Sequence, residues 1–170
     1  MKALTSIRIQ HLSIHLAESG TLLDAIPGIS VTTGDPTNAA RAPRFSSSKD
    51  DTVITDHKTG LQWAAEESAE RMTFAAAEKH FAALRLGGFD DWRLPDLEEL
   101  ESIRDLTRHE PCIDTGYFKS NSGWVWSRTP CAWSSDCAWI VSFYNGLVHG
   151  LRRSGSAFVR AVRRVSPAGQ

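Results

Sequence analysis

Residues 86–100, LGGFDDWRLPDLEEL, join two predicted helices, and this stretch decides how the rest of the chain is arranged. Gly87-Gly88 is expected to end the first helix, because glycine adopts the left-handed backbone conformation without strain. The chain must then turn, and Phe89 and Trp92 supply large apolar side chains that we expect to be buried in that turn. The stretch therefore has the composition of a joint between packed elements.

The second half of the stretch carries the signals that start a helix. Leu94-Pro95 favours an extended backbone, because the proline ring disfavours the helical conformation at the residue before it. Asp96 is predicted to be an N-cap with Glu99 three positions later, which is the capping-box arrangement. The pattern predicts a helix over residues 97–106 whose core-facing side chains are Leu97, Leu100 and Ile103.

The charged residues of the stretch allow a catalytic interpretation beside the structural one. Asp90, Asp91 and Arg93 could be reactive groups, but no nucleophile, base or metal-ligand pattern accompanies them. Arg93 is flanked by apolar residues, so we expect it to be partly buried and paired with a carboxylate, with Asp114 as one candidate. We favour the structural interpretation, in which five residues hold the fold: Trp92, Arg93, Pro95, Asp96 and Asp114.

Local patterns elsewhere predict an α+β fold, with helices in the middle and β-hairpins on either side. Residues 53–55 and 61–63 are short β-prone runs separated by a turn signal. In residues 73–84, Thr73 can cap a helix with an apolar stripe of Phe74, Ala77, Phe81 and Leu84.

The late part of the chain is predicted to be β-structure. Residues 123–130 contain a short strand, and residues 158–162 form the centre of the last one. Between them, the strand 139–144 is followed by Asn145-Gly146, a tight hairpin turn, and a returning strand.

The bulk composition indicates one soluble domain and argues against several classes of protein. The chain has 170 residues, of which 41% are hydrophobic, and a formal net charge of −1, so we expect no nucleic-acid partner. No segment approaches the roughly 20 apolar residues of a membrane helix. No signal-peptide pattern is found either, so we expect the protein in the cytoplasm, or in a phage or secreted particle.

The sequence predicts no cofactor and no metal. His11 and His15 have a spacing that could hold a metal on a helix, but no third ligand lies nearby. Cys112, Cys131 and Cys137 follow no zinc-like spacing and are expected to be small, half-buried apolar residues. A disulfide between Cys131 and Cys137 is the alternative in an oxidising compartment.

The charge is distributed unevenly along the chain. Acids are frequent from Asp50 to Glu110, whereas none follows Asp136, and the last segment carries five arginines: Arg152, Arg153, Arg160, Arg163 and Arg164. These arginines either form a basic binding face or pair with the acidic half of the chain. At least one of the pair Arg160 and Arg163 is expected to be a buried partner of an acid, because both alternate with apolar residues.

Six segments in fixed order carry a resemblance to a known family: TVITDHKTGLQW, GGFDDWRLPDLEEL, PCIDTGYF, WVWSRTP, AWIVSFYNGLV and VRAVRR. Over residues 44–164 the chain resembles a bacterial family typified by the C-terminal domain of the collagen-like adhesin Lcl. The resemblance implies a C-type-lectin-like fold, distantly related to the formylglycine-generating enzymes, with two helices on small twisted antiparallel sheets. The expected organisation is an N-terminal extension and linker (1–43), this domain (44–165) and a tail (166–170).

The resemblance implies recognition rather than catalysis. Members of the family are mostly binding modules, and the adhesin's domain binds sulfated polysaccharides, so a protein or an anionic polysaccharide is the expected partner. The cysteine pair and closing motif of a formylglycine-generating enzyme are missing, so no catalytic residue carries over. Three alternatives stay open: a structural subunit of a phage particle or secretion apparatus, the variable protein of a diversity-generating retroelement, and an enzyme that uses Cys131 or Cys137. The sequence leaves the oligomeric state open.

In the fold implied by the resemblance, the late hairpin and its loops build the ligand face. Alternation predicts that the odd-numbered side chains from Trp139 to Phe143 face the core and that Ser142 and Tyr144 face outward. An exposed aromatic beside arginines that no acid neutralises suits an anionic or amide-rich ligand. The predicted binding residues are Trp133, Ser142, Tyr144, Asn145, His149, Arg152, Arg153 and Ser154.

Overall fold

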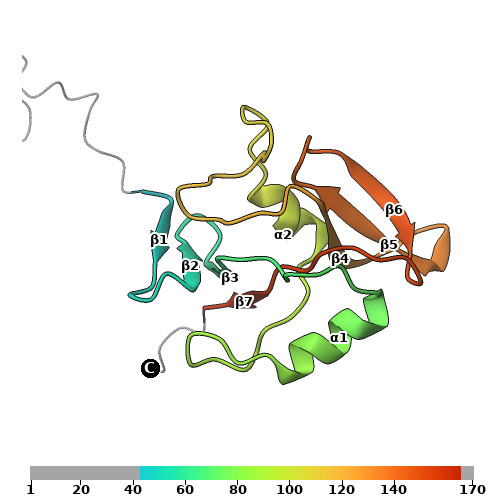
Figure 1. Cartoon of the computed structure of the whole chain (residues 1–170), viewed down its shortest axis with the longest axis horizontal. Coiled ribbons are helices and arrows are strands. Elements are labelled where there is room, and N and C mark those ends of the chain that lie inside the picture. The colour runs from blue at the N-terminus through green and yellow to red at the C-terminus, as the bar shows by residue number, and fades with distance from the viewer. Residues whose placement is uncertain (1–42, 166–170) are drawn as a thin grey trace, which may run out of the picture. The chain divides into compact units, whose positions relative to one another are not determined.

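The computed structural model describes residues 43–165, which contain two antiparallel sheets and two α-helices (Figure 1). This arrangement confirms the α+β class. The four-stranded sheet has the order β1 (Phe45–Ser47), β2 (Val53–Asp56), β3 (Leu61–Ala64) and β7 (Val162–Arg164). The three-stranded sheet has the order β4 (Trp124–Cys131), β5 (Ser134–Ser142) and β6 (Val148–Arg152). The helices are α1 (Phe74–Ala83) and α2 (Leu97–Ser102).

The predictions on His11 and His15, on residues 1–42 of the extension and on the tail at 166–170 lie outside the described residues. Within residues 43–165, no helix is long and apolar enough to cross a membrane.

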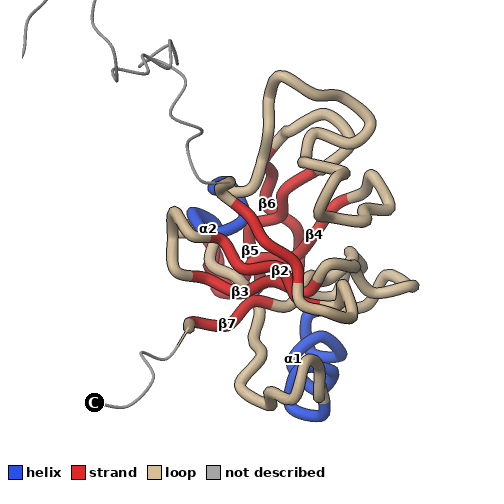
Figure 2. Tube along the Cα trace, turned by 90° about the vertical axis from the view of Figure 1, so that its left-hand side faces the viewer, coloured by secondary structure: helices blue, strands red, loops and turns tan. Residues whose placement is uncertain are grey.

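The two sheets lie side by side, with α1 below them in Figure 1 and again in Figure 2. Both predicted hairpins are confirmed: β2 pairs with β3, and β5 pairs with β6. The late turn is wider than predicted, because β5 ends at Ser142 and β6 begins only at Val148, so Phe143 and Tyr144 belong to the turn.

The strand β5 is covered on both faces, which corrects the predicted alternation. One cluster packs Val141 and Phe143 against Leu100 of α2, and a second cluster packs Ile140 against α1 and its surroundings. Ser142 lies on the Ile140 face and is only 3% exposed, so its prediction as an outward-facing residue is wrong. A period of two cannot separate core from solvent when both faces of a strand are buried.

The helix α1 begins as predicted and ends earlier than predicted. The Thr73 hydroxyl accepts a hydrogen bond from the Ala76 backbone amide at 3.3 Å, which confirms the cap. Gly87 and Gly88 have φ values of 59° and 80°, so both are left-handed, but they follow the end of α1 by several residues. They form a tight turn of their own, and a bulkier side chain at Gly87 would collide with Val53.

One side of the joint is attached to the four-stranded sheet. The Arg93 amide donates to the Val162 carbonyl of β7, and the Val162 amide donates back, both at 3.0 Å. Two residues earlier, the Asp91 carboxylate accepts from Arg163 Nε at 2.6 Å. The joint thereby extends the edge of β7 for a short distance.

The other side of the joint is attached to a bulge in β4. The Arg128 amide donates to the Pro95 carbonyl at 2.8 Å, and the Arg128 guanidinium forks onto the Asp96 carboxylate at 2.7 and 2.9 Å. The Leu97 amide donates to Thr129 Oγ1 at 2.9 Å. The first turn of α2 is therefore fixed to the second sheet, and residues 86–100 connect both sheets. These contacts are those that the structural interpretation of the stretch requires.

Within the joint, the two predicted aromatic anchors behave differently. Trp92 is buried, and its indole Nε1 donates to the Leu86 carbonyl at 3.0 Å, as a buried tryptophan requires. Phe89 is 38% exposed, so the prediction that it is buried is wrong. Its ring carries the Arg163 guanidinium, whose central carbon lies 3.7 Å from the ring centroid.

Arg93 is partly buried and paired with a carboxylate, as predicted, but the candidate partner Asp114 is wrong. Arg93 forks onto Glu99 at 2.7 and 2.8 Å, and Glu99 also accepts from the Asp96 amide as the capping box requires. Asp114 lies elsewhere: it pairs with Arg108 at 3.3 Å and accepts from the Gly116 amide at 3.0 Å. Glu99 lies in the first turn of the helix that begins just after Arg93, so its carboxylate is closer to Arg93 than that of Asp114, which comes later in the chain.

Candidate functional site

An aromatic and cationic surface lies on the outer end of the three-stranded sheet. Trp133 stands in the turn between β4 and β5 and is 66% exposed. Its ring meets the Trp139 ring edge to face, with centroids 5.1 Å apart. A Cβ added to Gly150 would lie 3.0 Å from Trp133 Cζ2 and 2.9 Å from Cys131 Sγ, so the glycine lets the indole lie close to β6.

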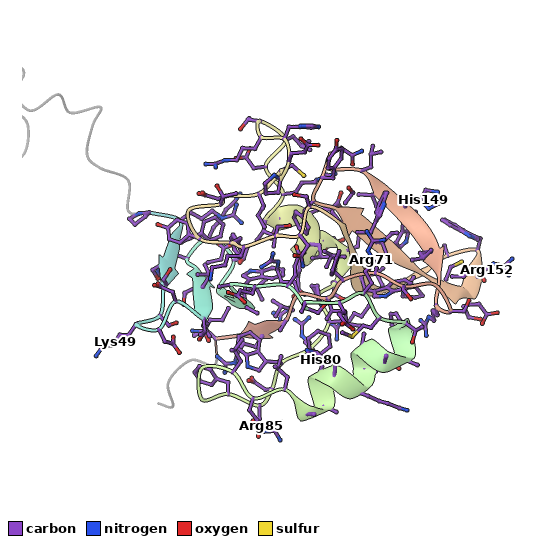
Figure 3. All side chains as sticks on the ribbon, in the orientation of Figure 1. Lys49, Arg71, His80, Arg85, His149 and Arg152 are labelled. Atoms are coloured by element: carbon purple, nitrogen blue, oxygen red, sulfur yellow. The ribbon has the colours of Figure 1, made fainter. Side chains whose placement is uncertain are left out.

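Arg152 belongs to the same surface. It follows Gly150 by two residues on β6, which places both on one face of the strand. Arg152 is exposed and makes no ion pair within residues 43–165. Figure 3 shows Arg152 at the outer end of β6. We call this set the Trp133 surface: Trp133, Trp139, Gly150 and Arg152.

The structure does not bring all the predicted binding residues to that surface. His149 points to the opposite face of β6, where its ring lies 6.3 Å from the Trp124 ring. Arg153 is half-buried, and its guanidinium stacks over the Phe74 ring of α1 with 4.3 Å between the central carbon and the centroid. Ser154 is exposed in the turn that follows β6.

Tyr144 and Asn145 lie at the opposite end of β6. The Tyr144 ring meets the His109 ring at 5.2 Å, and a hydrogen bond with Glu110 raises the pKa of the Tyr144 hydroxyl. The Asn145 side chain accepts from the Leu147 amide at 3.2 Å, so it stabilises its own turn. The predicted binding residues thus lie at two ends and on two faces of the β5–β6 hairpin and its adjoining turns.

The five late arginines also divide into two groups. Arg160 and Arg163 are buried and pair with Glu67 and Asp91, which confirms the expectation for these two. Within residues 43–165, the other three make no ion pair: Arg152, Arg153 and Arg164. Pairing with the acidic half of the chain therefore holds for Arg160 and Arg163, whereas a basic binding face stays a prediction.

The three cysteines are free thiols with the character of small apolar residues. Cys112 and Cys131 are buried and Cys137 is half-buried. Burial raises the pKa of Cys112, and burial followed by the neighbouring Cys137 raises the pKa of Cys131. Arg128, the cation nearest to Cys131 in sequence, is paired with Asp96. A reactive thiol requires the opposite shift.

No metal centre forms in the part of the chain that the structure describes. No group of three His, Cys, Asp or Glu side chains lies close enough to hold an ion there.

The fold and the exposed aromatic surface define a small α+β domain built on two antiparallel sheets. The family model described as the Lcl C-terminal domain matches residues 52–163, and the chain belongs to that family. The family is associated with an adhesin and is not a known family of enzymes. No curated protein matches the chain in a sequence comparison.

Sequence reasoning missed two components of the site. Gly150 was not singled out, although a glycine within a strand often marks the close approach of another group. Trp139 was expected to face the helices, whereas it supports the exposed Trp133 ring.

Proposed function

We propose that the chain is a non-catalytic recognition module that binds an anionic polysaccharide through the Trp133 surface. The observation that carries the proposal is the exposed, unpaired Arg152 on the same face as the 66%-exposed Trp133. We also propose the C-type-lectin-like class for the fold, since two helices on small antiparallel sheets fit it.

The chemistry of the surface suits sulfate or carboxylate groups on a sugar chain. An exposed indole offers a flat apolar face on which a sugar ring can stack. A guanidinium presents forked donors that match the oxygens of an anion. Asp136 lies on the neighbouring strand, where its carbonyl accepts from the Arg153 amide at 2.7 Å, but its carboxylate makes no ion pair with Arg152.

The family membership supports the same proposal, because the family is associated with an adhesin. The buried thiols support it as well, since the pKa of Cys131 is raised and the alternative of a cysteine-dependent enzyme needs a lowered one.

The test is capture of the full chain on immobilised heparin, dextran sulfate and neutral dextran. We expect capture on the two sulfated polymers, weakening as salt rises from about 0.05 M to 0.5 M, because screening shortens the reach of the charges. Equal capture on neutral dextran, or no capture on either sulfated polymer, would contradict the proposal.

A protein partner is the second candidate, favoured by a different observation. Tyr144 and Leu147 are exposed in the late turn, and Leu106, from the loop after α2, lies beside Gly146 of that turn; Leu106 is 68% and Leu147 58% exposed. We call these three residues the Leu147 surface. A group of exposed large apolar side chains is typical of a protein contact. The Leu147 surface therefore supports the alternative that the protein is a structural subunit of a larger assembly.

A further inference from the structure

A cavity of about 320 Å³ shares no lining residue with the Trp133 surface. It opens between the turn that joins β1 to β2 and the end of α1. The volume is at the lower end of the range for small-molecule sites, about 300–1,000 Å³.

Small side chains create the hollow. Ala64 and Ala161 lie at its floor, where the Ala64 amide donates to the Ala161 carbonyl at 2.9 Å. Phe81, Leu84 and Val159 stand around them and make the floor apolar. Larger residues at the two alanine positions would fill the space that these neighbours enclose.

The rim of the cavity carries an excess of negative charge. Lys119 Nζ pairs with Glu66 Oε1 at 2.6 Å, so these two charges offset each other. Asp50 and Asp51 remain. Hydrogen bonds from Ser48 and Thr52 lower the pKa of Asp50, so its carboxylate is charged at neutral pH.

Other ionisable groups near the cavity leave this excess in place. Glu67 lines the wall, but its carboxylate is paired with Arg160. His80 also lines the cavity, and a single positive charge there would not balance both Asp50 and Asp51. Lys49 and Arg85 point outward in Figure 3 and do not line the cavity.

We propose that this cavity binds a small organic cation, with an apolar body on the alanine floor and an ammonium group between Asp50 and Asp51. The apolar floor excludes a bare metal ion, and the carboxylates at the rim disfavour an anion of the same shape. The Phe81 ring adds to the apolar lining on which the body of the ligand packs. The site requires the opposite ligand charge to the Trp133 surface and does not depend on it.

The test is titration of the full chain, by calorimetry, with benzyltrimethylammonium, phenylacetate and benzyl alcohol. These probes share an aromatic body and differ in charge. We expect the cation to bind and the anion not to bind, with benzyl alcohol at least about tenfold weaker than the cation because it lacks the charge attraction. Binding of phenylacetate as tight as that of the cation would overturn the proposal, as would no binding of the cation.

A double variant, Asp50→Asn with Asp51→Asn, removes the rim charge with little change of shape. Asparagine tolerates the left-handed backbone of Asp51, whose φ is 55°. We expect affinity for the cation to fall about tenfold or more in this variant. The matched control, Glu98→Gln with Asp136→Asn, removes two exposed acids elsewhere and should bind as the wild type does. Equal affinity of the rim variant and the control would overturn the assignment.

A second variant, Ala161→Leu, tests the floor. It should abolish binding of the cation while the far-ultraviolet circular dichroism stays that of the wild type. Retained binding with an intact fold would overturn the placement of the apolar body. If Ala161→Leu does not fold, the Asp50/Asp51 variant decides the question by itself.

Discussion

The guanidinium of Arg160 and the carboxylate of Glu67 lie 2.9 Å apart, and neither side chain has any exposed surface. Arg160 also donates to three backbone carbonyls, those of Ala64, Ala65 and Lys119. Burial lowers the pKa of Arg160, and Glu67 works against that shift. The pair joins the segment before β7 to the segment after β3. Through the Lys119 carbonyl, Arg160 also joins both segments to the loop that precedes β4.

We therefore predict that Arg160→Met lowers the free energy of unfolding by about 3–5 kcal/mol, because it leaves Glu67 charged and buried without its partner. The control is Lys119→Met, which breaks the neighbouring Lys119–Glu66 pair. That pair is 2.6 Å long but mostly exposed, so its loss should lower the free energy of unfolding far less than loss of the buried pair does. Equal losses in urea denaturation would contradict the structural role of the buried pair.

A second prediction concerns the joint between the sheets. Trp92→Ala removes a buried indole and should lower the free energy of unfolding by about 3–5 kcal/mol. Trp133→Ala removes the same side chain from an exposed position and should change it by less than about 1 kcal/mol. Thermal denaturation of both variants measures the difference. A Trp92→Ala variant that melts like the wild type would show that residues 86–100 do not hold the fold.

The stability of the domain should fall in acid. The Arg128 hydrogen bond lowers the pKa of Asp96. Burial works to raise the pKa of Glu99, but hydrogen bonds from Arg93 and the Asp96 amide lower it overall. A carboxylate whose folded pKa is depressed contributes stability above its unfolded pKa of about 4, and that stability is lost as the pH falls through the folded pKa.

We expect the free energy of unfolding, measured with urea, to be lower at about pH 3 than at pH 7 for this reason. Arg128→Met removes the partner of Asp96 and should make the decrease shallower. A wild-type stability that is unchanged or higher at the acid pH would contradict the assignment.

The cysteines should react with iodoacetamide in order of exposure. Cys137 is half-buried and should be alkylated first, whereas burial keeps Cys112 and Cys131 protonated and shielded. Mass spectrometry of the native protein after brief labelling at neutral pH measures the order. Fastest labelling of Cys131 would instead indicate a reactive thiol and would favour the enzymatic alternative.

The joint was predictable because its signals are local. The residue before Pro95 must be extended, Asp96 favours a cap and Glu99 completes it, whatever the rest of the chain does. Trp92 was predictable for a similar reason, since a large aromatic beside a helix stop is most stable when buried. The partner of Arg93 could not be predicted from local signals, because several carboxylates could pair with it and only the packed structure selects Glu99.

The binding residues were harder to predict because β5 is buried on both faces. Alternation placed Ser142 outside, but a second layer formed by α1 and residues 157–161 covers that face. His149 and Arg152 are three residues apart on one strand, which puts them on opposite faces. The cavity could not be inferred from sequence, because alanines at positions 64 and 161 become a floor only when distant segments enclose them.

The central claim is that an anionic polysaccharide binds the Trp133 surface and not the other end of β6. Binding of heparin to the full chain should be compared, by biolayer interferometry, between two double variants of similar size change. Trp133→Ala with Arg152→Ala removes the Trp133 surface, whereas Tyr144→Ala with His149→Ala alters the residues that the structure places elsewhere.

Both variants should melt close to the wild type, because all four side chains are exposed or partly exposed. We predict that the first variant loses affinity about tenfold or more, as loss of an aromatic and an arginine at a contact centre does, and that the second keeps the wild-type affinity. Unchanged heparin binding by the first variant, or a larger loss in the second, would contradict the account.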